Sequence, residues 1–186
     1  PLAGLTAWQA LFDAANLQAG QRVLILAAAG GVGHLAVQLA KWKGAEVIGS
    51  ASQANHPFLR QLGCDQVVDY RSQDVADCVS DVDVLLDCLG GEAGIAALAC
   101  LKSGGVSVTL PSVTATQVTE AAEARGCRAL SLRVLPNGQQ LTQLLALMAE
   151  GSLRLQVDRV LPMAEVAEAH RYSETGRAQG KIILTP

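Results

Sequence analysis

One stretch, residues 22–44, restricts the possible folds more than any other part of the chain. It begins with an uncharged apolar run at 23–26 and continues through small residues at 27–31. It ends in a segment with apolar residues at helical spacing that stops at Gly44. A short apolar run of this kind is typical of a parallel strand covered on both faces. Strand, glycine-rich turn and helix in this order predict the first half of a mononucleotide-binding unit.

The glycine-rich turn has the properties that a phosphate site needs. The first turn of a helix presents unpaired backbone N–H groups and the positive end of the helix dipole, which attract a pyrophosphate. Small residues at Gly30, Gly31 and Gly33 keep side chains away from the phosphates. The spacing Ala28-x-Gly30-x-x-Gly33 matches the GxGxxG fingerprint with its first glycine replaced by alanine. The turn therefore predicts a dinucleotide-binding site.

Strands and helices alternate along most of the remaining chain. The pattern predicts strands at 46–51, 66–70, 82–88, 106–110 and 128–134, with helices at 5–16, 55–62, 74–79, 92–99 and 116–124. A second glycine turn follows the strand at 82–88. Right-handed crossovers between parallel strands then give a doubly wound α/β sheet, the three-layer Rossmann architecture, with ligands at the carboxyl ends of the strands.

The last quarter of the chain has a different pattern. We expect an amphipathic helix around 141–148, a strand at 157–161, a helix at 164–173 and a closing strand at 181–184, which do not extend the earlier alternation cleanly. We assign residues 1–135 to a dinucleotide-binding domain and residues 136–186 to a C-terminal segment.

Composition excludes several classes of protein. Of 186 residues, half are hydrophobic and 17% are charged, which favours a packed domain over disorder. A net charge of −3 gives no electrostatic reason to expect nucleic acid or an anionic membrane as partner. No apolar run reaches the ~18 residues needed to span a bilayer, and no signal peptide opens the chain, so we expect a cytoplasmic protein. Because the first residue is Pro1, we also expect a longer parent protein.

The five cysteines are scattered singly through the sequence, without a CxxC pair or a histidine at ligand spacing. This pattern is typical of small buried hydrophobic residues in a reducing compartment. It matches neither a disulfide framework nor a zinc site.

The end of the second predicted strand indicates which dinucleotide binds. An NAD site carries an acidic residue about 20 positions beyond the glycine turn, but residues 47–64 contain no Asp or Glu. The polar groups there are Ser50, Ser52, Asn55 and His56, which favour the 2′-phosphate of NADP(H). Ser52 is also a good helix N-cap. The cation that would balance the phosphate stays unexplained, because Arg60 lies a turn into the helix. The missing acid also argues against an S-adenosylmethionine-dependent methyltransferase.

Seven segments occur in the order found in a known family. They are GLTAWQAL (4–11), AAAGGVG (27–33), GSASQANH (49–56), LGCDQVVDYR (62–71), DCLGGE (87–92), LKSGG (101–105) and GRAQGKIILTP (176–186). Together they resemble the quinone oxidoreductase-like branch of the medium-chain dehydrogenase/reductase superfamily. Relatives that bind zinc carry a cysteine at the position of Leu2, so the resemblance implies the zinc-independent branch.

The resemblance also implies roles for individual residues. It places Thr6 near the nicotinamide, Ala29 to Val32 under the pyrophosphate, and Leu89 and Gly90 over the ribose. It places Ser52, Asn55 and Tyr70 near the adenosine phosphate. Lys181, in the closing GK motif, is expected either to reach the cofactor or to lie on a solvated strand flank. The predicted cofactor-binding residues are Thr6, Ala28, Ala29, Gly30, Gly31, Val32, Gly33, Ser50, Ser52, Asn55, Tyr70, Leu89, Gly90 and Lys181.

The implied reaction is hydride transfer from NADPH to a quinone or to an α,β-unsaturated carbonyl. The family's catalytic domain precedes this segment, so we expect the chain to bind cofactor without being fully catalytic, and we assign it no catalytic residue. His34 is expected to be exposed, His170 to be structural and Asp87 either to cap or to pair. The family also implies a homodimer through strand 128–134. A non-enzymatic nucleotide-binding scaffold or sensor is the alternative.

Overall fold

A computed structural model describes residues 1–186 and shows a six-stranded, fully parallel sheet with strand order β3-β2-β1-β4-β5-β6. The strands are β1 (Arg22–Ile25), β2 (Glu46–Ala51), β3 (Gln66–Asp69), β4 (Val82–Asp87), β5 (Leu101–Thr109) and β6 (Arg128–Ser131). The helices that connect them are α1 (Leu2–Trp8), α2 (Gly33–Trp42), α3 (His56–Gln61), α4 (Val75–Cys78), α5 (Gly91–Ala97) and α6 (Ala115–Glu123). The predicted doubly wound α/β fold is confirmed.

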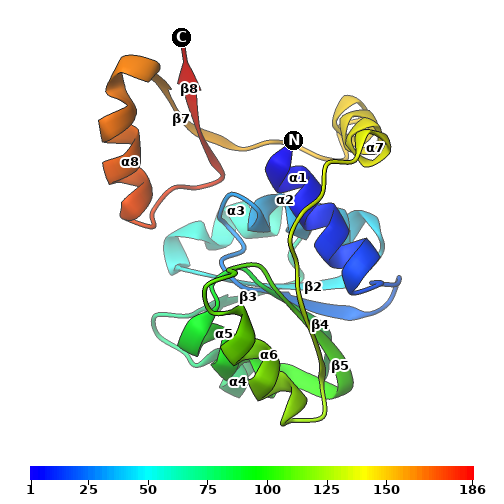
Figure 1. Cartoon of the computed structure of the whole chain (residues 1–186). Coiled ribbons are helices and arrows are strands. Elements are labelled where there is room, and N and C mark those ends of the chain that lie inside the picture. The colour runs from blue at the N-terminus through cyan, green and yellow to red at the C-terminus, as the bar shows by residue number, and fades with distance from the viewer.

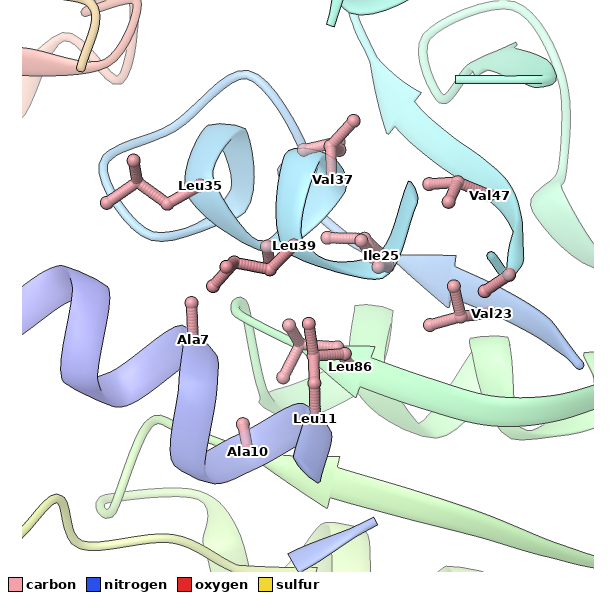
Figure 2. Packing of buried hydrophobic residues seen from close by; sticks show 14 of the residues in the cluster. Ala7, Ala10, Leu11, Val23, Ile25, Leu35, Val37, Leu39, Val47 and Leu86 are labelled. Carbon is pink, nitrogen blue, oxygen red and sulfur yellow. The ribbon is translucent and has the colours of Figure 1, made fainter. Parts of the chain in front are cut away.

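The sheet is the middle of three layers (Figure 1). Helices α1 to α3 cover one face and α4 to α6 cover the other. Successive strand residues point to opposite faces, so Val23 and Ile25 join the larger apolar cluster under α1 and α2, while Leu24 joins the smaller cluster on the other side. Figure 2 shows Ile25 and Leu86 between Leu39 of α2 and Leu11 of the first helical segment. Burial on both faces explains the uncharged strand sequences.

Within residues 1–135, three elements differ from their predicted bounds by three residues or more. The first helix starts at Leu2 and continues as a π-helix over Gln9–Ala14, and Leu11 within it and Leu17 after it are both buried in the core. Strand β5 starts at Leu101, because the register against β4 shifts between Val82 and Val84 and accommodates the exposed Lys-Ser-Gly residues at 102–104. Strand β6 ends at Ser131 instead of residue 134.

The C-terminal segment contains α7 (Gly138–Ala149), β7 (Val157–Pro162), α8 (Val166–Glu174) and β8 (Lys181–Thr185). A short 3₁₀ turn at Met163–Glu165 precedes α8, and two others lie earlier in the chain, at Gln53–Asn55 and Leu98–Cys100. Helix α7 packs on α1. As expected, this segment does not extend the main sheet: β7 and β8 are parallel, joined through α8, and form a separate two-stranded sheet. This unit stands away from the main sheet (Figure 1). The domain division at residue 135 stays a prediction.

No helix combines the length and the apolar character that crossing a membrane requires. Helix α8 buries only Ala169, and His170 beside it is exposed. The prediction of a structural role for His170 was therefore wrong, because no other element buries the side of α8 that carries it.

Candidate functional site at the carboxyl edge of the sheet

Both glycine turns lie where the direction of strand order reverses, after the adjacent central strands β1 and β4. A cavity of about 510 Å³ opens there. Of the predicted site residues, it is lined by Ala29, Gly30, Ser52, Asn55, Tyr70 and Leu89. The other predicted residues do not line it: Thr6, Ala28, Gly31, Val32, Gly33, Ser50, Gly90 and Lys181. The switch point of a doubly wound sheet is the usual place for a nucleotide.

Among the residues outside the lining, the side chains of Ala28 and Ser50 are buried. The Thr6 hydroxyl donates to the carbonyl of Leu2 within α1, at 2.9 Å. These positions shape the surroundings of the cavity, and their contact with a cofactor stays a prediction.

The first turn is compact because two backbones meet there. A Cβ on Gly33 would collide with the carbonyl oxygen of Ala27 and would lie 2.7 Å from the Cα of Ala28. Gly33 is therefore required for the packing of α2 on the end of β1, whereas the sequence suggested phosphate approach as the reason. Ala27 takes a left-handed conformation with φ of +50°, which is uncommon for a residue with a side chain.

His34 is fully buried, so the predicted exposure at the helix start was wrong. Its Nδ1 lies 2.8 Å from the carbonyl oxygen of Gly30, and its Nε2 is buried without a partner. Burial lowers the pKa of His34, the contact with Gly30 partly opposes this, and the positive charge of Lys181 lowers the pKa further. The imidazole is therefore neutral near pH 7 and donates through Nδ1 to Gly30, which fixes that peptide of the turn.

The second turn is held by a side chain. The buried Asp87 at the end of β4 accepts hydrogen bonds from the backbone N–H groups of Leu89 and Gly90 at 2.9 and 2.8 Å. Its other oxygen accepts from the hydroxyl of Thr109 at 2.7 Å. The predicted capping role of Asp87 is confirmed. Gly90 has φ of +69°, and a Cβ there would collide with the hydroxyl of Thr114, so this position needs glycine.

The lining of the cavity includes polar and positive side chains. Arg71 and Arg177 line it together with Ser52 and Asn55, and no acidic residue lines it. Ser52 makes no capping hydrogen bond to the following turn, and its hydroxyl instead accepts from Asn55 at 3.3 Å. The alternative role of Ser52 as a helix N-cap is therefore not observed.

The two arginines supply the positive charge that the sequence left unexplained. Sequence reasoning missed both. Arg71 directly follows Tyr70, so its place at the end of β3, next to β2, could have identified it. Arg177 comes from the C-terminal segment, 88 positions beyond Leu89, within the closing segment 176–186 in which the resemblance had singled out only Lys181.

The C-terminal segment reaches the first turn as well. The N–H of Gly180 donates to the carbonyl of Ala29 at 2.9 Å. A Cβ on Gly31 would lie 2.5 Å from Nζ of Lys181, so the lysine ammonium stands against the turn. Lys181 is half-buried, and burial lowers its pKa. Of the two positions expected for Lys181, the solvated strand flank is therefore not the one observed.

Comparison with known proteins identifies the family. A family model described as "Zinc-binding dehydrogenase" matches residues 62–184, which is more than half of the chain. The chain belongs to the zinc-binding dehydrogenase family. The predicted resemblance to quinone oxidoreductases of the medium-chain dehydrogenase/reductase superfamily is confirmed.

Three similar proteins illustrate the range of relatives. The quinone oxidoreductase structure from Coxiella burnetii is 42% identical with a TM-score of 0.97, and the match covers 100% of this chain and 59% of that one. NAD(P)H oxidoreductase RTN4IP1, mitochondrial, of Danio rerio is 33% identical over 100% of this chain and 55% of its own length. The 2-methylene-furan-3-one reductase of Solanum lycopersicum is 33% identical over 100% of this chain and 45% of its own length.

This zinc-binding dehydrogenase family member spans at most about 60% of the length of these relatives. It corresponds to their nucleotide-binding part, as a domain of the quinone oxidoreductase and enoyl reductase type. The cytoplasmic location stays a prediction, since the name of the Danio rerio relative places that protein in mitochondria.

The residues of this family member do not fit a zinc ion, despite the family's name. No group of three or more His, Cys, Asp or Glu side chains could hold a metal. Leu2 is exposed on α1 and has no donor atom. The five cysteines are free, and burial raises the pKa of Cys64 and Cys88 to about 12, which disfavours the thiolate that zinc binds. We derive no step through a metal.

Proposed function

We propose that this chain is the NADP(H)-binding part of a zinc-independent oxidoreductase that transfers hydride from NADPH to a quinone or an α,β-unsaturated carbonyl. One observation carries the choice of cofactor. Arg71, Arg177, Ser52 and Asn55 line the cavity at the sheet's switch point, and no carboxylate lines it. A phosphate monoester carries about −1.5 to −2 charges near pH 7 and accepts hydrogen bonds, so it matches this set of donors and cations.

The surroundings of the cavity suit the rest of a dinucleotide. The N–H groups at the start of α2 and the ammonium of Lys181 would hold the diphosphate. Tyr70 and Leu89, each about half exposed, also flank a neighbouring cavity of about 470 Å³ and offer an apolar slot for a planar base. The Leu89–Gly90 turn would cover the ribose, and Thr6 would lie toward the nicotinamide.

The nicotinamide, when bound, supplies the hydride, and the protein supplies binding and orientation. The choice of acceptor is supported by the names of the relatives, which include a quinone oxidoreductase and a 2-methylene-furan-3-one reductase. Stabilising an enolate oxygen requires positioned hydrogen-bond donors, and we assign that role to no residue of this chain. Full activity belongs to the complete protein.

Calorimetric titration of the purified chain with NADPH, NADH and S-adenosylmethionine tests the proposal. We expect NADPH to bind most tightly and S-adenosylmethionine not to bind. Absence of binding by either nicotinamide dinucleotide would contradict it. Assays of the full-length protein with quinones and enones then separate the oxidoreductase from the scaffold or sensor, because a scaffold would bind NADPH without oxidising it.

We also propose that the protein forms a homodimer through β6. This strand is the last of the sheet, and its outer edge has no paired strand. An open strand edge presents unpaired N–H and C=O groups that a second copy can pair. Light scattering coupled to size-exclusion chromatography of the full-length protein tests this, and a monomer at all concentrations would contradict it.

A further inference from the structure

A hydrogen bond joins two segments that are far apart in sequence, beside the candidate phosphate site of the cavity. Nε2 of Gln179 donates to Oδ1 of Asn55 at 2.9 Å, across 124 positions of sequence. Asn55 lines the cavity, whereas Gln179 does not. The same asparagine donates through Nδ2 to the hydroxyl of Ser52, at 3.3 Å. Gln179 thus contacts the candidate phosphate site through Asn55.

This contact selects one of two orientations of the Asn55 amide. An amide side chain has an accepting oxygen at one end and a nitrogen with two donor hydrogens at the other. The N–H of Gln179 attracts the oxygen and would repel the NH₂ group. Oδ1 is therefore held toward the C-terminal segment, and Nδ2 lies on the side of Ser52. One hydrogen of Nδ2 serves Ser52, and the second is free for a ligand.

Gln179 is well placed to hold the Asn55 amide because the backbone of the next residue, Gly180, is fixed by a hydrogen bond. Gly180 is buried with φ of +79°, and its N–H donates to the carbonyl of Ala29. The next N–H, of Lys181, donates to the carbonyl of Gln156 at 2.9 Å. A side chain that leaves a backbone already fixed loses little additional conformational entropy when it makes its hydrogen bond.

We propose that Gln179 is a specificity-positioning residue: by holding Oδ1 of Asn55, it turns the amide donors toward the 2′-phosphate and so favours NADPH over NADH. The inference rests on the proposed function. A phosphate oxygen accepts hydrogen bonds, so an amide turned the other way would present it with an oxygen. The 2′-hydroxyl of NADH both donates and accepts, and it is satisfied by either orientation. The orientation of Asn55 therefore affects the two cofactors differently.

The test compares dissociation constants for NADPH and NADH by calorimetry in the wild-type chain, in Gln179→Leu and in Gln179→Glu. Gln179→Leu removes the donor at similar size. Gln179→Glu replaces it with an acceptor, which attracts Nδ2 and reverses the amide. The matched control is Gln61→Leu, the same change at an exposed position on α3 that lies outside this cavity. Thermal unfolding of each variant confirms that it is folded.

We expect Gln179→Leu to weaken NADPH binding about tenfold, the effect of losing one hydrogen bond to a charged group, and to leave NADH binding within twofold. Gln179→Glu is expected to weaken NADPH more strongly, and Gln61→Leu to change neither constant. With Asn55→Ala already present, adding Gln179→Leu is expected to have no further effect on NADPH. Equal losses for both cofactors in both Gln179 variants would overturn the inference, as would a wild-type chain that binds both equally. A wild-type chain that binds neither would overturn the proposed function as well.

Discussion

The two glycine turns occupy equivalent places after adjacent strands, but different atoms hold them in shape. The first turn, between β1 and α2, is held by direct backbone packing at Gly33 and by the buried ring of His34. The second, between β4 and α5, is held by the buried carboxylate of Asp87, which accepts two backbone hydrogen bonds. A turn that depends on close backbone contact leaves only a spacing of small residues in the sequence, whereas the turn held by a side chain leaves a polar residue, Asp87, beside its glycine.

The comparison is tested most strongly at Gly33. We expect Gly33→Ala to lower the free energy of unfolding by about 3 kcal/mol, because the new methyl group meets backbone atoms that cannot move without separating α2 from β1. Urea unfolding measures the change. The matched control is Gly138→Ala at the start of α7, where nothing lies within 4 Å of the new Cβ. Equal stabilities of the two variants would show that the first turn is not held by this packing.

At the second turn, we expect Asp87→Asn to lower the free energy of unfolding by about 2 kcal/mol, since hydrogen bonds to a charged acceptor contribute about 1.5–3 kcal/mol. The Asn side chain has only one accepting oxygen for the two turn N–H groups and the hydroxyl of Thr109. Urea unfolding measures this change in stability, and NADPH titration measures cofactor binding by the same variant. Asp81→Asn, at an exposed position just before β4, is the control. A gain in stability would indicate that the buried charge at Asp87 is unfavourable.

The buried histidine gives the first turn a dependence on pH that the second lacks. Since the pKa of His34 is lowered in the folded state, protons bind more readily to the unfolded chain. The contribution of neutral His34 is complete above the ordinary histidine pKa of about 6.5 and is lost as pH falls below it, by at most about 1.4 kcal/mol per pH unit. We expect urea midpoints measured from pH 7.5 to 5 to fall less steeply in His34→Leu than in wild type.

The exposed His170 provides the control, because its side chain lies in solvent and not in the interior of the fold. His170→Leu is expected to follow the wild-type curve. Identical slopes for all three proteins would show that burial of His34 does not govern stability in this range. Carboxylates with lowered pKa, such as Asp65 beside Lys41, lose their contribution below the ordinary aspartate range and do not enter this window.

The sequence predicted most of the fold because parallel strands buried on both faces are uncharged, and β1, β2 and β4 show this directly. The extra length of β5 was hidden because Lys102, Ser103 and Gly104 resemble a turn and join the strand only through a register shift. The pairing of β7 with β8 was not predicted. The helix between them, α8, has a mostly exposed surface and so gave no sign that it covers a sheet.

The candidate site was predictable only where neighbouring residues define it. Gly30, Ser52 and Asn55 follow their strands within a few positions, so the topology brings them together. Arg177, Gln179 and Lys181 reach the same edge through the fold of the C-terminal segment. The burial of His34 has the same origin, because its surroundings include Lys181 from that segment. Hydrophobic periodicity and strand order do not predict such contacts, and only the resemblance, through its closing GK motif, indicated Lys181 in advance.

The smallest expected effect concerns Lys181, which contacts the first turn but not the second. We expect Lys181→Met to weaken NADPH and NADH binding by a similar factor of about three, since both carry the diphosphate and a single charge near a helix start contributes about 0.3–1 kcal/mol. The measurement is calorimetry at two salt concentrations, and the difference from wild type is expected to shrink at high salt because an electrostatic contact is screened. Lys43→Met, at the exposed far end of α2, is the control. A loss confined to NADPH would place Lys181 at the 2′-phosphate, and the assignment of the diphosphate to the first turn would then be wrong.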